Sequence, residues 1–191
     1  MARDRQAIEA RFRSGSRWFL IIAALSALAS LAFYQGIAWK ALGMVSLATP
    51  LVLDTAVKTI GGRWLWAEDL QYYCLLISLA LSAVFLLIGV LTSYASHTGA
   101  FLKLDKVFGI FARLGGAFGM AHLVGSRLIY FAGVVLYVAD GLLAFCLEFF
   151  LRNILTDLRV LVLTNLGFHC FVLVFLMYGL ASGFEKEKKP E

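Results

Sequence analysis

Three polar side chains interrupt apolar stretches of this 191-residue chain: Asp140, Asn165 and His169. Asp140 lies near the middle of one apolar segment, 128–150, and His169 lies in the first half of the next, 160–184. At about 1.5 Å per helical residue, Asp140 is about 15 Å and His169 about 13.5 Å from the connection between the two segments. If the segments are antiparallel helices, the two side chains have nearly the same depth and are expected to face each other. Asn165, one turn from His169, adds a hydrogen-bond donor and an acceptor on that face.

An Asp–His pair among apolar residues has three interpretations. It can be a hydrogen bond that fixes the register of two helices. It can be a proton- or ion-coupled site, because ionisable groups inside a membrane mark such pathways. It can also place His169 as the axial ligand of a pigment or haem, or act as an enzymatic acid–base pair. The first two are the main alternatives that the residues leave open.

The other patterns argue against an enzyme. Asp140 and Glu148 are about 12 Å apart along one helix axis, too far for a shared proton or a close glycosidase pair. The sequence has no Glu-x-x-His or His-Glu-x-x-His motif for iron or zinc. His97 and His122 fall in a connection, so a bis-histidine haem lacks its second ligand at the depth of His169. We therefore predict no enzyme activity, no metal site and no cofactor, with a pigment or haem ligand at His169 as the alternative.

The elements that position these residues must be membrane helices. Hydrophobic residues make up 61% of the chain and charged residues 15%, against about 25% in soluble domains, and the mean hydropathy is +0.85. The apolar residues form long blocks, so the lipid bilayer is the expected solvent. The formal charge of +5 comes from basic residues beside these blocks. This placement indicates anionic lipid headgroups as partners and not nucleic acid.

Four segments are long enough to span the hydrocarbon core: about 18–38, 71–94, 128–150 and 160–184. We predict an all-α polytopic membrane protein, a single domain over 1–191. With the N-terminus inside, twelve Lys and Arg residues flank the inner side and five flank the outer side, so both termini are predicted to be cytoplasmic. The composition suits a bacterial inner membrane. The alternative is the endoplasmic reticulum, because Lys188 and Lys189 resemble a dilysine retrieval signal.

Two connections carry further predictions. Residues 41–53 are apolar but short and contain Pro50, so they are expected to form an outer interfacial or re-entrant segment. The alternative is a fifth span, which would move the C-terminus outside. Residues 99–114 repeat apolar side chains at helical spacing, which predicts an amphipathic helix in the inner headgroup layer. Its basic residues Lys103, Lys106 and Arg113 are the expected headgroup ligands.

Small residues on the spans predict close helix packing, within the chain or against a partner. They are Ala23, Ala27 and Ser30 on the first span, and Gly133 and Gly141 on the third. With little mass outside the membrane, the leading hypothesis is an accessory or assembly subunit of a larger membrane protein complex. It would meet other subunits through faces that include the first-span residues. The alternative is a small oligomeric proton- or ion-linked transporter or channel that uses the Asp140–His169 pair.

Overall fold

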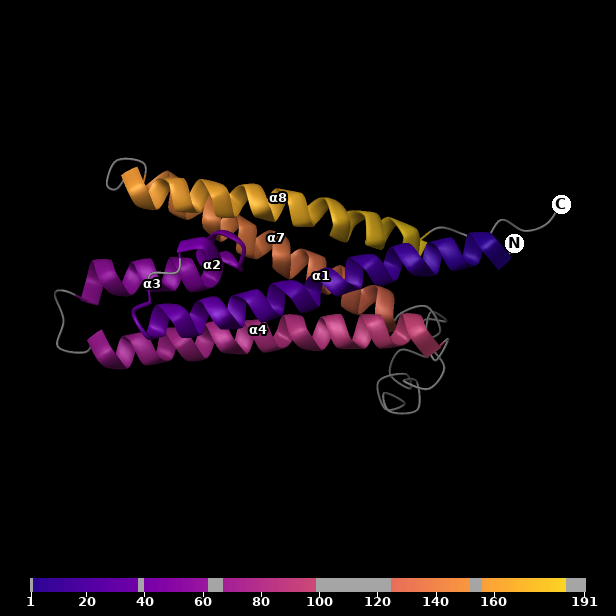
Figure 1. The fold of residues 1–191 in the computed structure, drawn as a ribbon, viewed down its shortest axis with the longest axis horizontal. Helices are drawn as coiled ribbons and strands as arrows, with labels where there is room; N and C mark the ends of the chain where they lie inside the picture. The colour runs from indigo at the N-terminus through magenta and orange to yellow at the C-terminus, as the bar shows by residue number, and fades with distance from the viewer. Residues whose placement is uncertain (1, 38–39, 62–66, 99–124, 152–155, 185–191) are drawn as a thin grey trace, which may run out of the picture.

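A computed structural model describes residues 2–37, 40–61, 67–98, 125–151 and 156–184. Every regular element in these ranges is a helix (Figure 1). The helices are α1 (Ala2–Tyr34), α2 (Lys40–Met44), α3 (Ala48–Gly61), α4 (Ala67–Thr98), α7 (Gly125–Leu151) and α8 (Thr156–Phe184).

Four of these helices contain a stretch long and apolar enough to cross a membrane: Ala10–Tyr34, Asp69–Ser93, Leu128–Cys146 and Val160–Ser182. Each overlaps one of the four predicted spans, and α3 is not among them. The prediction of an all-α membrane protein with four transmembrane helices is therefore confirmed. The predicted amphipathic helix at 99–114, with Lys103, Lys106 and Arg113, lies outside the described residues.

The first span differs from its predicted bounds at both ends. Helix α1 already begins at Ala2 because the arginine-rich start continues the same helix. It ends at Tyr34 and not near residue 38, because Gly36 adopts φ +70°. There the N–H of Gly36 donates to Phe33 O and the N–H of Ile37 donates to Ala32 O. This pair of bonds is a Schellman cap, which favours glycine at its left-handed position.

The four long helices spread apart towards one end of the bundle and leave a wedge between them there (Figure 1). Helix α1 packs along α4 and α8, and α7 packs along α8. Helix α7 runs obliquely, so that it leaves α8 and reaches α4 near the end of the bundle where α1 begins and α8 ends. At the opposite end α2 and α3 fill the wedge and contact α4, α7 and α8. This arrangement brings α3 close to the middle of α7.

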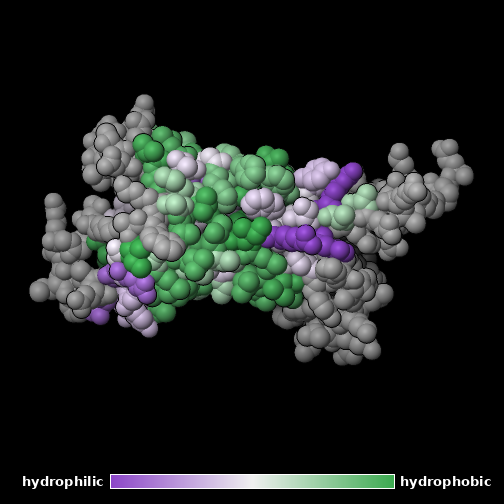
Figure 2. Space-filling model, viewed as in Figure 1, coloured by the Kyte–Doolittle hydropathy of each residue, from purple (hydrophilic) through white to green (hydrophobic). Residues whose placement is uncertain are grey.

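Aromatic side chains fill the core between the oblique helix and its neighbours. The Phe19 ring lies 5.1 Å from that of Tyr130 and 6.1 Å from that of Phe85, and Phe12 lies 4.8 Å from Tyr130. These rings are all buried. On the outside, α4, α7 and α8 expose large apolar side chains over most of their length, which gives the surface its broad apolar area (Figure 2). Such a surface suits lipid or protein neighbours.

The predicted small-residue faces pack inside the chain. Ala23, Ser30 and Gly133 are buried, and Ala27 is half-buried. A Cβ added to Gly133 would come within 2.9 Å of Phe19 and Ile88 side-chain atoms. The expectation that Ala23 and Ser30 meet other proteins is wrong, because the protein's own helices cover them.

Candidate functional site

The two short helices form a re-entrant hairpin whose tip reaches the depth of Asp140. Helix α2 enters the bundle, the chain turns at residues 43–49 (the hairpin tip), and α3 returns to the same end (Figure 1). Asp140 lies eleven residues before the end of α7 at Leu151, about 16 Å at the helical rise. The tip therefore reaches roughly the middle of an apolar core about 30 Å thick. A re-entrant segment was predicted at 41–53, and the hairpin extends over residues 40–61.

Asp140 holds the start of α3. The backbone N–H of Ala48 donates to Asp140 Oδ2. The backbone N–H of Thr49 donates to Oδ1 at 3.0 Å, and the Thr49 hydroxyl donates to the same oxygen. Asp140 is only 3% exposed. The carboxylate thus lies against the positive end of the α3 dipole, where a negative charge is stabilised.

The start of α3 has no backbone donor left without an acceptor. The N–H of Leu47, just before the helix, donates to Ser26 Oγ of α1 at 2.8 Å. Pro50, the third helical residue, has no N–H. A helix start leaves four backbone positions without an acceptor inside the helix. Here they are Leu47, which bonds Ser26; Ala48 and Thr49, which bond Asp140; and Pro50, which has no N–H to satisfy. This matters at this depth, because an unpaired N–H surrounded by hydrocarbon costs several kcal/mol.

Asn165 of α8 holds the other side of the hairpin tip. Its Nδ2 donates to Gly43 O at 2.7 Å and to Ser46 O at 3.0 Å. The side chain is fully buried. Asn165 was predicted on the same face as the Asp–His pair. It shares that region but bonds the hairpin backbone, where it satisfies the carbonyl of Gly43 in α2 and that of Ser46 just after it.

His169 joins Asp140 as the matched depths predict. Its Nε2 lies 2.9 Å from Asp140 Oδ2, and its Nδ1 lies 2.9 Å from the backbone oxygen of Asn165. The ring also stacks on that of Tyr137, with centroids 4.7 Å apart and an interplanar angle of 12°. Gly141 makes room for it, since a Cβ there would lie 3.3 Å from His169 Cδ2.

The geometry determines the net charge of the pair. A carbonyl oxygen can only accept, so Nδ1 carries a hydrogen. One further proton lies between Nε2 and Oδ2. On the ring it makes an imidazolium–carboxylate pair, and on Asp140 it makes two neutral groups. Both arrangements have zero net charge, which lowers the cost of placing ionisable groups at this depth.

We call Asp140, Asn165 and His169 the polar centre. Two buried polar atoms in or beside it have no hydrogen-bond partner among the described residues: Asn165 Oδ1 and the Tyr137 hydroxyl. Buried polar atoms are usually paired, and an ordered water is a common partner. Within the same ranges, no three His, Cys, Asp or Glu side chains come close enough to hold a metal ion.

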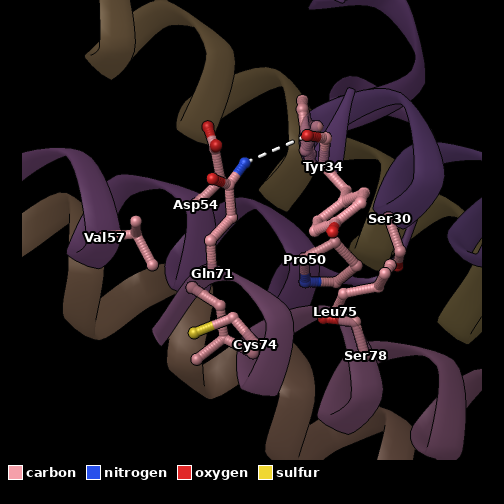
Figure 3. A pocket seen from close by; sticks show the side chains of 11 residues that line it. Ser30, Tyr34, Pro50, Asp54, Val57, Gln71, Cys74, Leu75 and Ser78 are labelled. Carbon is pink, nitrogen blue, oxygen red and sulfur yellow. Dashed lines mark hydrogen bonds between the residues drawn. The ribbon is translucent and has the colours of Figure 1, made fainter. Parts of the chain in front are cut away.

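A separate cavity of about 30 Å³ lies between α1, α3 and α4, on the hairpin side of the bundle (Figure 3). That volume accommodates about one or two water molecules. Gln71 reaches across it and donates to Tyr34 O at 3.0 Å. Asp54 and Pro50 contribute from α3. Pro50 is the residue after Thr49, so the cavity ends close to the polar centre.

Sequence reasoning missed two residues that make hydrogen bonds at the hairpin tip, Ser26 and Thr49. Small polar residues such as these are common in apolar helices, and these two acquire their partners only when the hairpin inserts between the long helices. A helix start at Thr49-Pro50 could have been inferred, because proline is favoured in the first helical turn.

The fold and the site define a class: a polytopic helical membrane protein with a re-entrant hairpin held at its tip by a buried Asp–His–Asn centre. Comparisons with protein-family models, with curated proteins and with solved structures find no match to the chain.

Proposed function

We propose that the protein is an accessory or assembly subunit of a larger integral membrane protein complex, in which it supplies a rigid helical packing unit. The observation that carries this proposal is that the hydrogen bonds of Asp140 and His169 lie within the chain. Asp140 accepts from two backbone N–H groups and a hydroxyl and contacts His169, and both ring nitrogens of His169 have partners within the chain. An ionisable pair whose bonds hold the start of α3 and the backbone of α8 suits a structural role.

The external surface supports the same proposal. The exposed faces of α4, α7 and α8 carry large apolar residues such as Leu87, Phe145 and Val174, which are 58%, 56% and 67% exposed. Packing between membrane helices proceeds through close van der Waals contact. These faces, and not the covered stripe of α1, are the surfaces that remain for other subunits.

The proposal includes no enzyme activity and no resident cofactor. A pigment or haem bound through His169 would have to replace one of the two hydrogen bonds of the ring. We place the protein in a bacterial inner membrane with both termini in the cytoplasm, and the endoplasmic reticulum is the alternative.

Transport is the second candidate, and one observation favours it. A re-entrant helix start faces an ionisable pair near mid-membrane, which is an arrangement found in transporter binding sites. The shared proton between Asp140 and His169 and the unpartnered hydroxyl of Tyr137 are the groups that such a path would use. Four spans are few for a transporter, so this function would require a homo-oligomer.

Two measurements on the same preparation separate the candidates. The first is the mass and subunit composition of the particle extracted in mild detergent. The second is proton flux by the purified chain in proteoliposomes, with Asp140→Asn as the comparison. We expect the extracted particle to contain other membrane proteins in fixed stoichiometry. We also expect the parent chain to show no more proton flux than the Asp140→Asn variant. A homogeneous homo-oligomer whose flux disappears in a correctly folded Asp140→Asn variant would establish transport instead.

A further inference from the structure

The surface shared by the start of α1 and the end of α8 combines basic and aromatic side chains. The guanidinium carbon of Arg11 lies 5.4 Å from the centroid of the Tyr178 ring, a cation–π distance. The ring of Trp18 lies 5.2 Å from that of Phe175. We call this surface the basic–aromatic patch, and its members are Arg11, Ser14, Arg17, Trp18, Phe175 and Tyr178.

The α1 side of the patch places a small residue between two guanidinium groups. Successive helical residues are about 100° apart, so Ser14 lies about 60° from Arg11 on one side and about 60° from Arg17 on the other. Ser14 and Arg17 are exposed, and Arg11 is half-buried. A phosphodiester above Ser14 would therefore have a hydroxyl below it and an arginine one turn away in each direction. Arginine forms paired hydrogen bonds with phosphate oxygens.

The patch changes from charged to apolar along the membrane normal. Arg17 directly precedes the long apolar stretch of α1, and Trp18 begins it. Figure 2 shows strongly hydrophilic side chains where the apolar surface ends, on the side of the chain N-terminus. Towards the bundle centre the same face exposes Ile21, Phe171 and Val174, at 44%, 52% and 67%. Tryptophan and tyrosine are the residues that occupy headgroup level in membrane proteins.

We propose that the basic–aromatic patch binds one anionic phospholipid. Its phosphate contacts Arg11, Ser14 and Arg17, and an acyl chain lies along Trp18 and Phe175. Charge complementarity selects this occupant, since the order of basic, amphipathic and apolar side chains matches the order of groups in the lipid. A zwitterionic lipid adds a cationic group beside two arginines and binds more weakly.

The test uses Trp18 as the reporter. Replacing Trp39, Trp64 and Trp66 with phenylalanine leaves Trp18 as the only indole. Its fluorescence is quenched by bromine on a contacting acyl chain, so titration with brominated phosphatidylglycerol and brominated phosphatidylcholine gives a relative binding constant. We expect phosphatidylglycerol to be preferred. Each arginine removed should lower the preference about fivefold, the scale expected for one basic residue near anionic headgroups, so the double variant Arg11→Gln/Arg17→Gln should lower it about 25-fold.

The matched control is Lys40→Gln/Lys58→Gln, which removes the same charge from α2 and α3, at the opposite end of the bundle. This control should keep the preference for phosphatidylglycerol. Equal quenching by both lipids in the parent, or an equal loss in the control, would overturn the proposal. Native mass spectrometry of the unmodified chain supplies a second measurement without tryptophan substitution. It should retain phosphatidylglycerol and release phosphatidylcholine, and equal retention would also contradict the site.

Discussion

Truncating Asp140 to alanine should destabilise the protein more than any other single change at the polar centre. The substitution leaves the N–H groups of Ala48 and Thr49, the Thr49 hydroxyl and the ring of His169 without their common partner. Hydrogen bonds inside membrane proteins contribute about 0.6 kcal/mol on average, and a buried group left unpaired costs about 1–3 kcal/mol. For four such groups, the hydrogen-bond average predicts a loss in unfolding free energy of about 2 kcal/mol. The lower limit of the cost of an unpaired buried group predicts about 4 kcal/mol.

Milder variants should form a graded series. In Asp140→Asn the amide oxygen can still accept from Thr49 and the amide nitrogen can donate to His169. Only the N–H of Ala48 loses its acceptor, so we expect a loss of about 1–2 kcal/mol. Thr49→Val removes one hydroxyl bond and should cost about 1 kcal/mol. Thr164→Val is the matched control. Its exposed hydroxyl bonds only to Val160 O within its own helix, and its effect should be close to zero.

The free energy of unfolding can be measured by titration with SDS in bicelles, followed by tryptophan fluorescence and far-UV circular dichroism. The expected order of stability is parent, Thr49→Val, Asp140→Asn, then Asp140→Ala. An Asp140→Ala variant as stable as the parent would show that the hairpin tip is not held by this carboxylate. Equal losses in Thr49→Val and Thr164→Val would refute the assignment of the hydroxyl bond.

Four further outcomes follow from the packing. Gly15→Ala should destabilise by about 1–3 kcal/mol in SDS unfolding, because its Cβ would clash with the hydroxyl of Tyr130. The loss should be smaller in a Tyr130→Phe background, and a loss of the same size there would contradict the clash. Ser26→Ala should cost about 1 kcal/mol by removing the acceptor at the hairpin tip, and an unchanged unfolding free energy would refute that bond. Asn165→Leu should raise amide hydrogen exchange in the hairpin tip relative to α4, whereas uniform exchange across the chain would indicate global loosening. Single cysteines at positions 4 and 187 should react with an impermeant maleimide from the same side of the membrane, and labelling from opposite sides would disprove the even number of spans.

The four spans and the pairing of Asp140 with His169 could be predicted from the sequence. Apolar runs of sufficient length have few alternatives in a bilayer, and the constant rise of a helix converts residue number into depth. Two residues equally far from one short connection must therefore lie level with each other. The side chains that hold the hairpin could not be predicted this way. Ser26 and Thr49 look like any small polar residue in an apolar helix, and Asn165 gave no indication that its partners are carbonyls about 120 residues away.

What the sequence by itself determined is thus the number of spans, the short apolar segment between the first two, and the depth of the ionisable pair. Hydropathy and helical rise act along each helix and require no knowledge of neighbours. Only the tertiary structure decided how deep the hairpin inserts, which faces of α1 are covered and what Asp140 bonds to. Those features depend on rotation of each helix about its axis and on the oblique course of α7, which opens the wedge that the hairpin fills. Once α3 begins inside that wedge, its unpaired N–H groups need acceptors that water cannot supply, and Ser26 and Asp140 lie where they can provide them.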